Sequence, residues 1–147
     1  MIKISDVKRA CNDVVSKAFP NINLYGNDTY DGYTRPAFFT EIIPKPHSHE
    51  SKNYASGGAT YKATLLEKTH DELLCLSIYD DIRKAFGMTL HVVDRILVVG
   101  DISFEFIGES MDTLQVSVEF EWIEQKERIE TEPAADELAV SMEKKGD

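Results

Sequence analysis

The clearest pattern along the chain is an alternation of apolar and polar residues from Thr113 to Ile123. Every second position there carries an apolar side chain: Leu114, Val116, Val118, Phe120 and Trp122. This period of two predicts a β-strand with one face on a core and the other toward water or a partner. Residues 102–107 repeat the alternation, and residues 110–112 are turn formers. The two segments are therefore expected to form an antiparallel hairpin.

Two other segments carry apolar residues at helical spacing. The first helix is predicted at residues 6–18, with Ser5 as its N-cap. Its apolar stripe comprises Val7, Ala10, Cys11, Val14, Val15 and Ala18. The second helix is predicted at residues 70–86, with Thr69 as its N-cap and Gly87 as its stop. Its expected core face comprises Leu74, Cys75, Ile78, Ile82, Ala85 and Phe86.

Shorter segments rich in β-branched and aromatic residues complete the predicted elements. They are strands at residues 22–25, 37–43, 59–66, 89–93 and 96–99, the last running into 102–107. A long polar loop is expected at residues 44–58. This order of elements predicts an α+β fold: a single mixed, mostly antiparallel β-sheet with two helices packed on one face. The polar face of the sheet should then be free.

The chain divides into a folded part and an acidic tail. Residues 1–123 are expected to form one domain, and residues 124–147 a C-terminal tail that is flexible or forms a short helix. The tail has eight acidic and four basic residues, a net charge of −4. No apolar run approaches the roughly 20 residues that span a bilayer, and no signal-peptide core is evident at the start. We expect a soluble intracellular chain without membrane contact.

Charge and cysteine content narrow the function. The chain has 26 acidic and 16 basic residues, a net charge of −10. This argues against binding DNA by neutralising its phosphates, although a ring could still surround passing DNA. Cys11 and Cys75 lie on the helical stripes and are predicted to be buried free thiols, with a disulfide between them as the alternative.

Residues that could carry chemistry form no convincing set. His47 and His49 would point the same way in an extended chain and could bind zinc. Further ligands would have to be Glu41, His70 or His91, at no characteristic spacing, so an exposed loop is the favoured interpretation. No nucleophile or phosphate-binding motif is present. We predict a non-enzymatic protein with no catalytic residue, no metal and no cofactor; a small metal-dependent hydrolase is the alternative.

Aromatic, basic and acidic residues of two loops and the last strand suggest contacts with other proteins. Tyrosine and arginine are favoured at interface hot spots. The predicted interface residues are Tyr30, Tyr33, Arg35, His47, His49, Lys52, Tyr54, Glu119 and Glu121. The alternative for the loop tyrosines is that they cover a strand edge of their own domain.

Three stretches also resemble a known family. Residues 25–28 and 32–39, with Pro44 closing the stretch, resemble a motif of tail terminator proteins from phages and prophages of Gram-positive bacteria. The resemblance continues through residues 90–95 and 116–120. These motifs are structural, and it is their order and spacing that are specific.

The resemblance implies a small α/β structural protein of the virion tail, assembled in the host bacterial cytoplasm. Such proteins form a ring, usually a hexamer, that caps the head-proximal end of the tail tube and ends tube polymerisation. Implied partners are copies of itself, the tail tube protein, the head–tail connector and, in contractile tails, the sheath, with DNA only as passing cargo. The alternative within this class is a different head–tail connector or completion ring.

Overall fold

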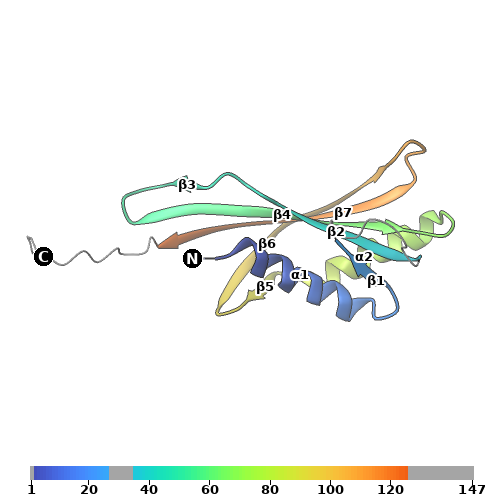
Figure 1. The fold of residues 1–147 in the computed structure, drawn as a ribbon, viewed down its shortest axis with the longest axis horizontal. Coiled ribbons are helices and arrows are strands. Elements are labelled where there is room, and N and C mark those ends of the chain that lie inside the picture. The colour runs from blue at the N-terminus through green and yellow to red at the C-terminus, as the bar shows by residue number, and fades with distance from the viewer. Residues whose placement is uncertain (1, 27–34, 126–147) are drawn as a thin grey trace, which may run out of the picture.

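The centre of the fold is a seven-stranded sheet. The computed structural model describes residues 2–26 and 35–125. Its strands are β1 (Asn23–Tyr25), β2 (Ala37–Pro44), β3 (Ser48–His49), β4 (Tyr54–Leu66), β5 (Thr89–Val92), β6 (Arg95–Ile107) and β7 (Thr113–Gln125). They lie in the order β1-β2-β4-β7-β6-β5, and β3 also pairs with β4 (Figure 1). Only β1 and β2 pair in parallel. The predicted α+β fold with a mixed, mostly antiparallel sheet is confirmed.

The longest pairing joins β4 to β7, from Tyr54 opposite Gln125 to Thr64 opposite Gln115. On its apolar face the predicted alternation is confirmed, because the inward side chains of both strands are buried: Ala59, Tyr61, Ala63, Leu65, Leu114, Val116, Val118, Phe120 and Trp122. The hairpin of β6 and β7 also forms, with Ile107 opposite Thr113. This face is the platform on which the core is built.

Both helices pack on that apolar face, as predicted. Helix α1 spans Ile4–Ala18 and α2 spans Glu72–Phe86. Tyr61 of β4 contacts both: its hydroxyl donates to Asn12 Oδ1 at 2.7 Å, and its ring lies 6.1 Å from that of Phe86. Burial raises the pKa of Tyr61, so it stays a neutral donor.

The helix starts differ from the predicted ones. Helix α1 begins at Ile4, not Asp6, with Lys3 as an N-cap that makes no side-chain bond. The start is held instead by the Ile2 amide, which donates to the buried Glu124 carboxylate at 2.8 Å. Helix α2 begins at Glu72, and its N-cap is Asp71 rather than the predicted Thr69.

The buried stripe of α2 is narrower than predicted. Only four of its side chains are buried: Cys75, Ile78, Ile82 and Phe86. Leu74 and Ala85, both expected in the core, are exposed. A spacing of three and four residues covers a single line along a helix. Helix α2 therefore meets the core along one line only, and residues flanking that line stay outside.

The predicted loop at residues 44–58 is largely β-structure. Strand β4 begins at Tyr54, and β3 pairs Ser48 with Ser56. Gly57 and Gly58, which were expected within that loop, lie in β4 and permit close approach of the neighbouring strand. A Cβ on Gly57 would lie 2.9 Å from Trp122 Nε1, and a Cβ on Gly58 would lie 2.6 Å from the Phe120 carbonyl oxygen. Because these two residues have no side chain, β7 can pair closely with β4 at this point.

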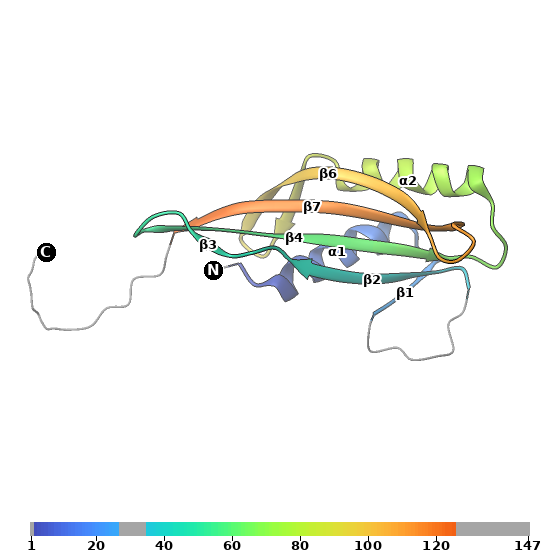
Figure 2. The same cartoon turned by 90° about the horizontal axis from the view of Figure 1, so that it is seen from above.

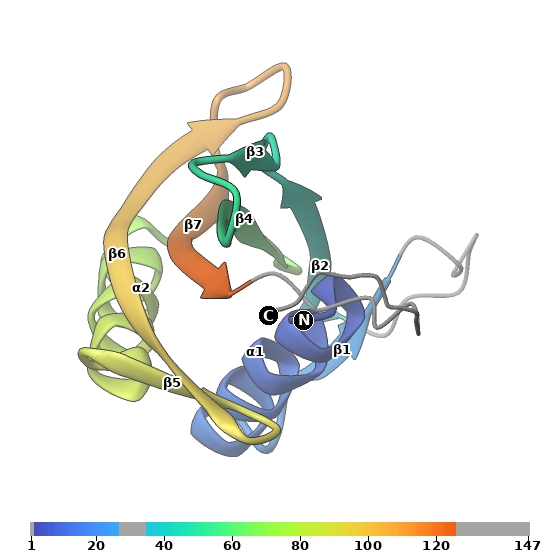
Figure 3. The same ribbon diagram turned by 90° about the vertical axis from the view of Figure 1, so that its left-hand side faces the viewer.

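Strand β6 is continuous where two segments were predicted. Its pairing with β7 shifts between Val99 and Ile102, and the strand bends through a wide arc between β5 and the turn into β7 (Figure 3). Gly100 lies in this irregularity, where a Cβ would come within 2.9 Å of the Glu119 carbonyl oxygen. A bulge of this kind increases the local twist, and here it curls the sheet.

The polar face of the sheet is not entirely free. Thr64 and Gln115 are buried there, and the Gln115 amide donates to the Thr64 hydroxyl at 3.1 Å. The expectation of a free polar face is wrong at this pair. Farther along β7 the same face opens, and the Glu121 side chain is 80% exposed.

Replacing Asp71 by alanine tests the observed start of α2. The Asp71 carboxylate accepts from the Leu74 amide at 3.3 Å, so its loss should lower the free energy of unfolding by about 1 kcal/mol. Chemical denaturation measures this value. Thr69→Ala is the matched control and should change stability by less than half as much. A larger loss for Thr69→Ala would contradict the observed cap.

Candidate interaction surfaces

One end of the sheet projects beyond both helices (Figure 2). We call this projection the arm: β3, the turn at residues 50–53, residues 54–58 of β4 and residues 121–125 of β7. Trp122 supports it from the apolar side, where its indole lies against Gly57. Backbone pairing with β7 supplies the remaining order. The arm therefore presents an extended surface with little core of its own.

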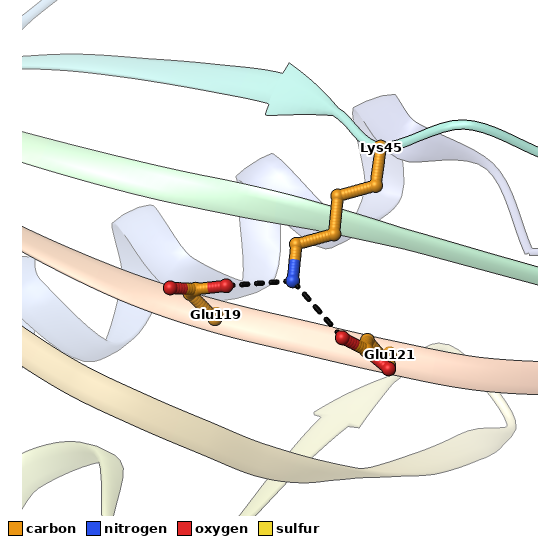
Figure 4. Close-up of polar contacts among 3 residues, drawn as sticks. All are labelled: Lys45, Glu119 and Glu121. Carbon is orange, nitrogen blue, oxygen red and sulfur yellow. Dashed lines mark hydrogen bonds and ion pairs between the residues drawn. The ribbon is translucent and has the colours of Figure 1, made fainter.

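A charged cluster lies at the base of the arm. The Lys45 ammonium group donates to Glu119 Oε1 at 2.7 Å and to Glu121 Oε2 at 3.2 Å (Figure 4). The hydrogen bond that Lys45 donates to Glu119 raises the pKa of Lys45. These contacts hold the segment after β2 against β7. The Glu119 side chain is 40% exposed and that of Glu121 is 80% exposed. The two ion pairs therefore contribute little stability, and they leave carboxylate oxygens facing solvent.

The structure brings six of the predicted interface residues together on or beside the arm. They are His47, His49, Lys52, Tyr54, Glu119 and Glu121. The first four are exposed. The two imidazole rings pack edge to face with centroids 5.5 Å apart. Their presence at an interface stays a prediction, but their gathering on one projection is observed.

The other predicted interface residues are not on the arm. Arg35 lies just before β2 and donates to the Glu67 carbonyl oxygen at 3.1 Å, beside the end of β4. Tyr30 and Tyr33 lie outside the described residues. Arg35 is therefore not part of the arm.

The hairpin of β5 and β6 exposes an apolar surface that sequence reasoning missed. Its inner face is buried through Leu90, Val92 and Leu97. Its outer side carries the hairpin patch, defined as Val93, Ile96 and Val98, which are 83%, 59% and 68% exposed. The signal was present in the sequence, because residues 96–99 are apolar without alternation. A strand with apolar side chains on both faces is normally packed against another element on each face. Here α1 packs against the inner face of the hairpin.

A second apolar surface surrounds the start of α2. Leu73, Leu74 and Leu76 are exposed there, with Leu73 at 77%. Leu74 also lines a groove of about 400 Å³ between α2 and the end of α1, whose other walls include Phe19, Ile22 and Pro36. These residues are exposed because of the narrow buried stripe of α2.

The cysteines are unsuited to nucleophilic chemistry. Both are buried free thiols, as predicted. Burial raises the pKa of Cys11, and burial together with Glu67 raises the pKa of Cys75 to about 12. Neither forms a thiolate near neutral pH unless a cation binds. Within residues 2–26 and 35–125, the cluster that could hold a metal is Glu67, His70 and Cys75, not the predicted alternative at His47 and His49.

Comparisons with solved structures give weak likenesses. One solved protein, known by a sequence identifier alone, is 9% identical with a TM-score of 0.49, covering 86% of this chain and 94% of its own. A chain from the virion of a native gene transfer agent particle is 8% identical with a TM-score of 0.49, covering 82% and 95%. At these scores neither likeness bears on function. No curated protein matches the chain.

Across the described part of the chain, neither helix is long and apolar enough to cross a membrane.

Comparison with models of protein families shows the family of the chain. The model of the phage tail terminator protein family matches residues 6–132. The match includes α1 from its third residue, α2 and every strand of the sheet, and therefore the arm and the hairpin patch. The chain thus belongs to the phage tail terminator family and is a structural protein of the phage virion that contacts other tail components.

Proposed function

We propose that this protein caps the head-proximal end of the tail tube, ends tube polymerisation and provides the surface for head–tail joining. It acts as a hexameric ring whose partners are its own copies, the tail tube protein and the head–tail connector, with the sheath added in a contractile tail. It assembles in the host bacterial cytoplasm. Family membership supports this function. The structural observation that supports ring formation is the exposed hairpin patch.

The hairpin patch suits contact between copies of the chain. Its three side chains are apolar and lie beside β5, which is an edge strand of the sheet. Exposed apolar groups at a sheet edge favour association. Val93 also has a φ of 55°, a conformation that glycine or asparagine adopts at lower cost. An apolar side chain kept there despite backbone strain and exposure is best explained by a contact.

The arm suits contact with the tube or the connector. It extends beyond the helices and carries mostly exposed charged and polar groups, with the exposed Tyr54 and Ile123 among them. A polar projection can bind a partner and still stay soluble before assembly. The acidic chain, at −10, also suits a ring through which DNA passes without being held.

Removing the gene from its phage tests the capping role. Tube growth should lose its stopping point, so electron microscopy should show tubes of widely varying length. Complementation with the intact chain should restore one length. Tails of normal length without heads would contradict the capping role and indicate a joining protein instead.

Replacing Ile96 and Val98 by aspartate tests the hairpin patch. Burying two carboxylates in an apolar contact is unfavourable, so self-association on tubes should weaken by about tenfold or more. Negative-stain microscopy of purified tubes mixed with the protein would measure ring occupancy against concentration. Met111→Asp is the control, since it adds a carboxylate at an apolar residue that is 66% exposed and lies outside both apolar surfaces. Equal loss in both variants, with unchanged melting temperatures, would remove the hairpin patch as the ring contact.

Changing Lys52 to glutamate together with Tyr54 to serine tests the arm. Both side chains are exposed, so stability should change by less than about 0.5 kcal/mol for each, while phage with the variant should yield tubes of uneven length or tails without heads. Thermal melting and microscopy give the two readouts. The control is Lys84→Glu with Met111→Ser, two exposed residues off the arm. Normal virions from the arm variant would contradict the proposal.

A further inference from the structure

The connection from β4 to α2 brings three metal-binding residue types together. Glu67 directly follows β4, His70 lies in the turn, and Cys75 is in the first turn of α2. The Cys75 thiol donates to Glu67 Oε2 at 3.4 Å, and His70 Nδ1 lies 3.5 Å from the same oxygen. One donor atom from each residue lies within 4.8 Å of the others. The three side chains converge on one point.

The carboxylate of Glu67 is poorly satisfied in this arrangement. Its side chain is only 8% exposed. Its Oε1 atom is buried and, among the described residues, has no hydrogen-bond partner. No lysine or arginine of residues 2–26 or 35–125 pairs with it. A buried carboxylate is unfavourable unless a cation or several donors compensate its charge.

Hydrogen bonding alone does not explain the cluster. A thiol is a weak donor, and it satisfies one oxygen of Glu67 while leaving the other without a partner. The separation of His70 Nδ1 from Glu67 Oε2 exceeds the usual length of an N–H···O bond, about 2.7–3.2 Å. The contact is an ion pair when His70 is protonated. When the imidazole is neutral with a lone pair on Nδ1, two acceptor atoms face each other, which is the arrangement expected around a shared cation.

Two of the three spacings fit tetrahedral coordination. Zinc lies about 2.0–2.3 Å from oxygen, nitrogen and sulfur ligands. At tetrahedral angles these lengths put neighbouring ligand atoms about 3.3–3.7 Å apart. The two shorter separations in the cluster, 3.4 and 3.5 Å, match this range.

The ligand types indicate which metal would bind. A thiolate and an imidazole favour zinc or a similar transition metal over magnesium or calcium, which prefer oxygen ligands alone. His70 is 37% exposed and opens the site to solvent, so a water can take a fourth position. We propose that Glu67, His70 and Cys75 bind one zinc-class transition-metal ion that ties the end of β4 to the start of α2.

Zinc and cobalt(II) titrations of the metal-stripped full chain test this site. We expect one equivalent of either metal per chain, a thiolate-to-cobalt charge-transfer band and a higher melting temperature with zinc. Cys75→Ala and His70→Asn should each weaken zinc binding by about 100-fold or more, since even outer-shell changes cost 10–100-fold. The cobalt band should disappear in Cys75→Ala.

Two matched controls separate this site from other possibilities. Cys11→Ala removes the other buried thiol, and the double change His47→Asn with His49→Asn removes the exposed histidine pair. Both should keep zinc affinity within about threefold of the unchanged chain. His70 is at the surface, so circular dichroism should show a folded His70→Asn variant even where Cys75→Ala fails to fold. Absent binding, binding undiminished in His70→Asn, or binding lost in the histidine-pair control would overturn the proposal.

Discussion

Pairing of β4 with β7 is the interaction on which the structure depends. The two strands are hydrogen-bonded from Tyr54 and Gln125 to Thr64 and Gln115, and the other strands of the described residues extend the sheet on either side of them. β2 lies along one side and β6 along the other. Both helices rest on their apolar face, where Tyr61 bonds to α1 and packs against α2. A protein of this size can bury one core of this kind, and the two central strands supply its floor.

The same pair of strands extends past the core that it supports, and this connects the fold to the proposed function. The end of the pair that carries β3 projects beyond both helices (Figure 2). Order there comes from the backbone ladder, from Trp122 beside Gly57, from the bond of the Ile2 amide to Glu124 and from the ion pairs of Lys45. Segments with few buried apolar contacts open at lower free energy than a core. The arm can therefore adjust to a partner while the core stays intact, which suits the proposed seating on a tube end.

Sequence patterns predicted the parts that depend on a single element facing a core. The alternation in β7 could be recognised without knowledge of its neighbours. Gly57 and Gly58 were misjudged because glycine indicates a turn unless a cross-strand neighbour such as Trp122 explains it. Leu74 was placed in the core because helical periodicity cannot tell how wide a stripe the neighbouring elements cover. In each case the missing information was the position of a second element.

The candidate sites depend even more on such positions. The hairpin patch could have been suspected, because an apolar run such as residues 96–99 needs a cover on both faces. The site of Glu67, His70 and Cys75 could not, since Cys75 serves the helical stripe equally well and the spacing matches no known metal motif. Its cause is local nonetheless: Asp71, rather than Thr69, caps α2, so the chain from Glu67 to His70 stays outside the helix. That short non-helical connection lets the carboxylate and imidazole turn back toward a cysteine in the first helical turn. The same residue choice that sets the helix boundary thus also creates the cluster.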